Sequence, residues 1–119
     1  MSQNIDPQTF AEEWIAAWNE RDLDRILSHY AEKVVFWSPR IVLVTGNATC
    51  VARGIDALRV YWQQALDRNP NLRFELERVY ASKDAITIAY RNHRGQSAAE
   101  TLMFDERGLV TEGLAAYTS

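Results

Sequence analysis

The sequence predicts an α+β domain in which helices cover one face of a mostly antiparallel sheet. In the first 70 residues, apolar side chains recur every three or four positions, as they do in amphipathic helices. Beyond Pro70, apolar and polar residues alternate, which is typical of strands with one buried face. A chain of 119 residues is long enough for one hydrophobic core. We therefore expect a single domain over residues 1–119.

Three helices are expected in the N-terminal part, at residues 7–19, about 23–30 and about 55–68. Asp6 is a favourable N-cap for the first, and Pro7 suits the first helical position. Asp22 is a suitable cap for the second helix, and Asn69-Pro70 ends the third. The short link between the first two helices requires them to pack at an angle.

Strands are expected at residues 34–37, 72–80, 85–92, 97–104 and 109–117. The first is rich in β-branched and aromatic residues and is ended by Ser38-Pro39. Short turn-forming segments separate the last four, so these strands form a meander. Residues 41–45 and 49–52, joined by Gly46-Asn47, are expected to form a further hairpin.

Charge and composition argue against several kinds of partner. The net charge is −3 and no basic cluster is present, so we expect neither nucleic acid nor an anionic membrane as a partner. The longest aliphatic run, residues 41–44, cannot span a bilayer, and the N-terminus lacks signal-peptide features, so a soluble, cytoplasmic protein is expected. The single Cys50 cannot form an internal disulfide. His29 and His93 are far apart in sequence, so no metal and no cofactor is expected.

Four longer stretches occur in order: WIAAWNERDLD (residues 14–24), YAEKVVFWSP (30–39), GIDALRVYWQQAL (54–66) and ETLMFDERGLVTEGLAAY (100–117). Together they resemble the nuclear transport factor 2-like superfamily, in its SnoaL-like and ketosteroid isomerase-like branch. The resemblance implies a curved, cone-shaped sheet whose helices enclose a pocket, with frequent dimers through the outer sheet face. The functions of the superfamily are diverse, so the fold alone does not identify a reaction.

The resemblance also assigns positions in the pocket. In ketosteroid isomerases an Asp base follows the first strand, and a helix-one Tyr and a protonated Asp form the oxyanion hole. The base position is Ser38 here, the Tyr position is Trp14, and a supporting Tyr in the third helix is Trp62. Only the sheet carboxyl remains, as Glu100. Because a serine alone cannot take a proton from carbon at neutral pH, these differences argue against the same isomerase reaction.

Glu100 is the candidate catalytic residue, because it lies in an otherwise apolar strand. If it faces the pocket, loss of water raises its pKa and leaves a neutral donor or a poised acid/base group. The alternatives are a Glu100 that faces solvent and one paired with Arg91 or Arg73. The loop between the two central strands bears on this choice. A three-residue loop, 93–95, with a bulge at its glycine would place Glu100 opposite Ile88, on the face of Tyr90.

A two-residue Arg94-Gly95 turn would instead place Ala89 and Arg91 beside Glu100, but it requires a positive φ at the arginine, which makes it the less favourable choice. The candidate ligand-binding residues are Trp14, Trp18, Phe36, Ser38, Trp62, Ile88 and Tyr90.

Two functions remain open from the sequence. One is an enzyme that isomerises, cyclises or dehydrates a small apolar carbonyl compound, with Glu100 as its acid/base group. The other is a non-catalytic module that binds a small apolar ligand or dimerises. The outward-facing Thr101 and Met103 favour a homodimer through the outer sheet face.

Overall fold

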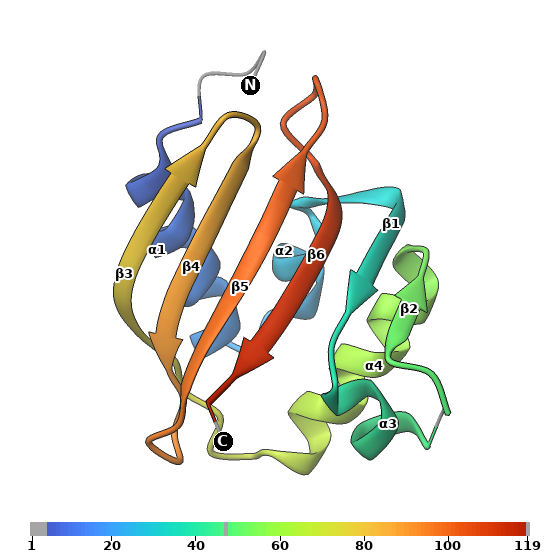
Figure 1. Cartoon of the computed structure of the whole chain (residues 1–119). Coiled ribbons are helices and arrows are strands. Elements are labelled where there is room, and N and C mark those ends of the chain that lie inside the picture. Colours follow the sequence, from blue (N-terminus) through green and yellow to red (C-terminus); the bar gives the residue numbers. More distant parts are fainter. Residues whose placement is uncertain (1–4, 47, 119) are drawn as a thin grey trace.

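A six-stranded sheet forms the body of the molecule, and the order of its strands is β2-β1-β6-β5-β4-β3 (Figure 1). The computed structural model describes residues 5–46 and 48–118. The strands are β1 (Tyr30–Trp37), β2 (Val51–Arg53), β3 (Glu75–Ser82), β4 (Ala85–Arg91), β5 (Ser97–Phe104) and β6 (Val110–Tyr117). Neighbouring strands are antiparallel except β1 and β6, which are parallel.

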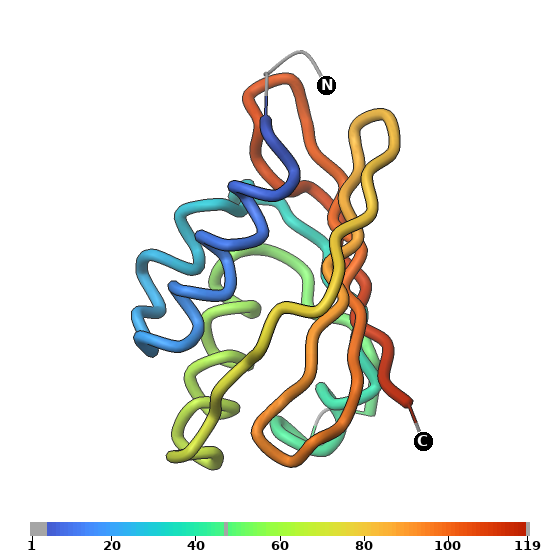
Figure 2. Tube along the Cα trace, turned by 90° about the vertical axis from the view of Figure 1, so that its left-hand side faces the viewer, coloured from blue at the N-terminus to red at the C-terminus, as the bar shows by residue number. Residues whose placement is uncertain are grey.

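The helices are α1 (Pro7–Asn19), α2 (Leu23–Leu27), α3 (Arg40–Thr45) and α4 (Ile55–Arg68). Figure 2 shows α1, α2 and α4 on one side of the sheet, and α3 at its lower end. The hydrophobic core lies between these two layers, where Trp14, Leu58 and Ile88 are completely buried. The predicted α+β architecture is therefore confirmed. In the described part of the chain, no helix has the length and apolar character needed to cross a membrane.

The first and third predicted helices begin and end as expected, at 7–19 and 55–68. Asp6 caps α1, because its Oδ2 accepts a hydrogen bond of 2.9 Å from the Thr9 amide. The second helix is shorter than predicted and ends at Leu27. Tyr30 belongs instead to β1, where it pairs with Val110 of β6.

The predicted hairpin at 41–45 and 49–52 is wrong. Residues 41–45 lie in helix α3, whose N-cap Pro39 already has helical backbone angles and whose C-cap Gly46 has φ 75°. A proline at the start and a left-handed glycine at the end favour a helix, and they outweigh the β-branched residues between them. The other half of the predicted hairpin is displaced to Val51–Arg53, which pairs with β1.

The edge strand β3 begins and ends later than the predicted 72–80. Asn19, at the end of α1, holds the backbone of Phe74 with two hydrogen bonds, of 2.9 Å to its carbonyl and 2.7 Å from its amide. These bonds take the place of a strand partner, so regular pairing starts only at Glu75. At the other end, a tight turn with Asp84 at φ 60° allows pairing as far as Ser82.

Candidate functional site

The loop between β4 and β5 directs Glu100 to the helix-covered face. Gly95 has φ 77°, and the Asn92 amide donates to the Gln96 carbonyl at 2.9 Å, as the bulged three-residue loop requires. Ile88 consequently lies opposite Glu100, so the predicted register is confirmed. Glu100 is 5% exposed, between the equally inward Ala98 and Leu102 on its strand. The carboxyl is thus held out of water.

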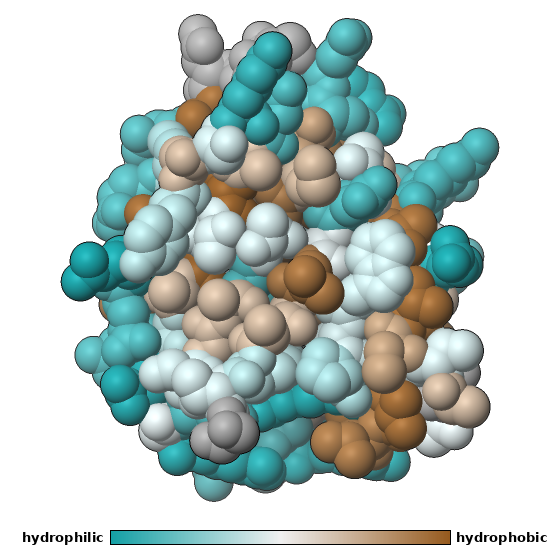
Figure 3. All heavy atoms as spheres, viewed as in Figure 1, coloured by the Kyte–Doolittle hydropathy of each residue, from teal (hydrophilic) through white to brown (hydrophobic). Residues whose placement is uncertain are grey.

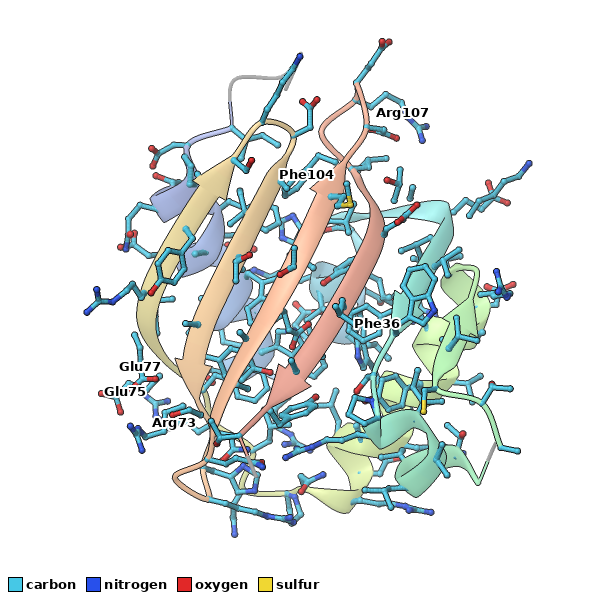
Figure 4. The ribbon with its side chains drawn as sticks, in the orientation of Figure 1. Phe36, Arg73, Glu75, Glu77, Phe104 and Arg107 are labelled. Atoms are coloured by element: carbon cyan, nitrogen blue, oxygen red, sulfur yellow. The ribbon has the colours of Figure 1, made fainter. Side chains whose placement is uncertain are left out.

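The salt-bridged alternative for Glu100 does not occur. Arg91 pairs with Glu77 at 3.2 Å, on the exposed side of the sheet. Figure 4 shows Arg73, Glu75 and Glu77 gathered beyond the outer edge of β3, away from the core. Neither Arg91 nor Arg73 therefore pairs with Glu100, which lies among apolar and aromatic side chains.

A cavity of about 70 Å³ lies between the sheet and helices α3 and α4, and Glu100 forms part of its wall. Its apolar wall contains Trp18, Phe36, Trp62 and Phe74. His93, which is exposed, and Asn69 border it at the surface. Ligand pockets commonly measure about 300–1,000 Å³. This cavity is much smaller, so it encloses a small ligand or the reactive end of a larger one.

Within the cavity, Tyr90 and Glu100 form a buried pair. The Tyr90 hydroxyl donates to Glu100 Oε2 at 2.7 Å. Burial raises the pKa of Glu100 to about 7, and the Tyr90 hydrogen bond and the charge of Arg40 lower it only in part. Burial also raises the pKa of Tyr90, which therefore stays a neutral donor. Near neutral pH, the Glu100 carboxyl exists in both protonation states.

Two polar atoms in the cavity wall are buried without a hydrogen-bond partner in the described structure: Glu100 Oε1 and Trp18 Nε1. Trp18 is 3% exposed, and its ring packs edge-on against Trp62 with centroids 5.1 Å apart. Buried polar groups in folded proteins are nearly always paired, and each unpaired one costs about 1–3 kcal/mol. Both residues line the cavity, so these two atoms are candidates for pairing with a ligand.

The structure places five of the predicted site residues in the cavity wall: Trp18, Phe36, Trp62, Tyr90 and Glu100. Trp14, Ser38 and Ile88 are buried outside it. The indole nitrogen of Trp14 donates to the Tyr30 hydroxyl at 3.0 Å, so this donor is already used. Ile88 packs in the core.

Ser38, at the position of the isomerase base, has a structural role. Its Oγ accepts from the Tyr61 hydroxyl at 3.2 Å and from the Arg40 amide at 3.2 Å, at the start of α3. Ser38 is 1% exposed and lies behind the cavity wall, where it holds two wall residues, Arg40 and Tyr61. The structure therefore supplies no base at this position.

Arg40 and Tyr117 are among the wall residues that sequence reasoning missed. The Arg40 guanidinium lies 3.9 Å above the centre of the Tyr117 ring, and its Nη2 contacts Gln96 Oε1. Arg40 is the first residue of helix α3, whereas the sequence predicted a strand at 41–45. The proline before Arg40 was the available signal for a helix start.

A curved sheet closed by helices is the nuclear transport factor 2-like, or cystatin-like, fold, which solved structures share with this chain. Among proteins of this fold the chain belongs to the SnoaL-like family, whose domain model matches residues 11–117. The resemblance seen in the sequence is thereby confirmed. A comparison with the curated proteins finds no match.

Solved structures agree with this assignment. A SnoaL-like protein of unknown function from Burkholderia thailandensis is 40% identical, with a TM-score of 0.88 over 95% of each chain. A candidate isomerase of the SnoaL-like family from Agrobacterium tumefaciens is 17% identical, with a TM-score of 0.75 over 95% of this chain and 97% of its own. An NTF2-like protein of unknown function from Cytophaga hutchinsonii is 12% identical, with a TM-score of 0.71 over 99% of this chain and 95% of its own.

Proposed function

We propose that the chain binds a small, largely apolar molecule in the Glu100 cavity and exchanges a proton with it through Glu100. The observation that carries this proposal is the pair of unpartnered buried atoms, Glu100 Oε1 and Trp18 Nε1, in one cavity wall. A ligand oxygen that accepts from the indole N–H and meets the carboxyl would satisfy both. Such a ligand would remove the free-energy cost of leaving these two polar groups unpaired.

The two protonation states of Glu100 determine what it does. Because Oε2 already accepts from Tyr90, the proton of the neutral acid is available on Oε1, where it can be donated to a ligand oxygen. The ionised form accepts a proton at the same atom. With a pKa of about 7, both forms are populated near neutral pH, which suits general acid/base catalysis. Isomerisation, cyclisation or dehydration of a small carbonyl compound would use such a group.

The test is the turnover of small α,β-unsaturated and β-dicarbonyl compounds, followed by NMR. We expect Glu100→Gln to lower turnover by about 100-fold or more while ligand binding persists, because the amide cannot transfer a proton. Glu112→Gln, on the exposed face of β6, is the matched control and should behave like the wild type. Equal rates for wild type and Glu100→Gln would remove Glu100 from the mechanism.

A non-catalytic binding module is the second candidate, and the hydrogen bonds of Ser38 favour it. Ser38 is fully engaged with Tyr61 and Arg40, so the position of the isomerase base holds no proton acceptor for a carbon acid. This candidate predicts ligand binding without turnover. Product formed under single-turnover conditions would exclude it.

We also propose a homodimer through the uncovered sheet face. Large apolar side chains are exposed there, namely Trp37, Tyr80, Met103 and Leu114. Pale and brown surfaces occupy the middle of this face in Figure 3, with hydrophilic residues around them. Apolar areas of this kind commonly mark interfaces between proteins.

We expect light scattering to give a dimer at micromolar concentration and Leu114→Asp to give a monomer, because the new charge would be buried at the interface. Leu43→Asp is the matched control, since Leu43 is exposed on α3 and not on the sheet. A monomeric wild type would contradict the proposal.

A further inference from the structure

Arg40 places an unbalanced positive charge in the cavity wall. Its partners are the neutral Gln96 amide and the Tyr117 ring. In the described part of the chain, Arg40 forms no ion pair, whereas Arg25, Arg91 and Arg107 each pair with a carboxylate. A guanidinium presents its N–H groups in a planar fork that matches a carboxylate, so Arg40 is suited to an anionic partner.

The other titratable groups around Glu100 do not balance this charge. They are Tyr30 on β1, Tyr61 on α4, Tyr90 on β4, Tyr117 on β6 and His93 in the β4–β5 loop. Burial raises the pKa of each of these tyrosines, which keeps their hydroxyls neutral. Burial and the nearby arginines lower the pKa of His93, which favours its neutral form. Glu100 is therefore the one acidic group in the wall that can offset Arg40.

One negative charge, on Glu100 or on a ligand, is enough to balance the positive charge of Arg40. When Glu100 is ionised, its carboxylate offsets the charge of Arg40. When Glu100 is protonated, the charge of Arg40 is left for a bound molecule. An anionic ligand and an ionised Glu100 would repel each other, and this repulsion is stronger near the buried Glu100 than in bulk solvent. Binding of an anion and protonation of Glu100 are thus favoured together.

We propose that the cavity selects small aromatic acids, whose carboxylate pairs with the Arg40 guanidinium while Glu100 stays protonated. This inference rests on the proposed binding function of the same cavity and names its ligand class. The aromatic part of the ligand follows from the wall, which contains Trp18, Trp62 and Phe74. Because the cavity measures about 70 Å³, it encloses one end of such a ligand and not the whole molecule. The acidic part follows from Arg40.

The experiment measures calorimetric affinities for three pairs of probes: benzoate and benzamide, cinnamate and cinnamamide, and 2-naphthoate and 2-naphthamide. The two members of each pair have nearly the same shape and differ in charge. At pH 6, we expect the wild type to bind at least one carboxylate about tenfold or more tightly than its amide. Arg40→Gln should lose this preference, and Arg40→Lys should keep part of it, because lysine retains the charge without the fork.

Arg107→Gln is the matched control for the loss of one positive charge. Arg107 lies at the opposite end of the sheet from α3 and pairs with Asp105, so this variant should bind the probes as the wild type does (Figure 4). Circular dichroism checks that each variant is folded. Raising the pH from 6 to 8.5 should weaken carboxylate binding to the wild type by about tenfold. Carboxylate binding to Glu100→Gln should be independent of pH in this range.

The outcomes separate this inference from the proposed function. If the wild type binds amides as tightly as carboxylates, or Arg40→Gln keeps the preference for carboxylates, the selectivity for acids is wrong and the binding function stands. If carboxylate affinity does not fall between pH 6 and 8.5, the linkage to Glu100 is wrong. If the wild type binds none of the six probes, the selectivity for aromatic acids is wrong, whereas the proposed function is decided by the turnover assay with Glu100→Gln.

Discussion

Replacement of Trp14 by alanine is expected to lower the free energy of unfolding by about 3–5 kcal/mol. Trp14 is 0% exposed and packs against Trp18, Phe74 and Tyr90, with ring centroids 6.2, 5.9 and 5.5 Å away. The alanine variant would leave a large void and would remove the donor that Tyr30 now accepts from. Because domains of this size are stable by about 5–15 kcal/mol, this is a large share of the total. Urea unfolding followed by circular dichroism measures the loss.

Trp37→Ala is the matched control, since Trp37 is 37% exposed on the outer sheet face. We expect it to cost less than about 1 kcal/mol, measured at a protein concentration where both variants have the same oligomeric state. The comparison shows how much of the lost stability comes from the burial of the tryptophan, because both variants remove the same side chain. Similar losses for the two variants would show that Trp14 is not a central part of the core.

Glu100→Gln is expected to change how stability depends on pH. The pKa of Glu100 is about 7 in the folded protein and 4.5 without burial, so between these values the folded state keeps a proton that the unfolded state has released. Stability therefore decreases as the pH rises through this range. The stabilisation that protonated Glu100 gives the folded state is complete below about pH 4.5 and is lost above about pH 7. This stabilisation amounts to about 3 kcal/mol, at roughly 1.4 kcal/mol for each unit by which the two pKa values differ.

Glutamine has nearly the shape of glutamic acid and still accepts the Tyr90 hydrogen bond, but it never ionises. We expect Glu100→Gln to match the wild type near pH 5 and to exceed its stability by about 3 kcal/mol at pH 8.5. Urea unfolding at pH 5, 6, 7 and 8.5 measures the difference. The exposed Glu112→Gln should follow the wild type throughout. Parallel curves for wild type and Glu100→Gln would show that the carboxyl is not desolvated.

The parts of the site that sequence reasoning located depend on short-range geometry. The loop at 93–95 fixes the pairing of β4 with β5. The inward direction of Glu100 therefore follows from Gly95, the third residue of that loop. The first helix likewise follows from its own cap, Asp6, and Pro7. In each case the deciding interactions lie within a few residues of one another.

The parts that could not be located depend on contacts between distant segments. Arg40 is the first residue of helix α3, and its contacts with Gln96 and Tyr117 join residues more than 50 positions apart. The resemblance to ketosteroid isomerases assigned both Trp14 and Trp62 to the pocket. Only Trp62 lies in the wall, because the Tyr30 hydroxyl accepts from Trp14 and holds it in the core.

The stacking of Arg40 on Tyr117 has a practical consequence for handling the protein. Tyr117 is the last residue of β6, and Thr118 follows it with its amide bonded to the Ser97 carbonyl at 3.0 Å. Tyr117 lines the cavity, so the end of β6 lies close to it, whereas the described chain begins at the other end of the molecule (Figure 1). An affinity tag or a fluorescent label fused at the N-terminal side leaves the cavity free, and one fused at the C-terminal side would stand in the way of incoming compounds.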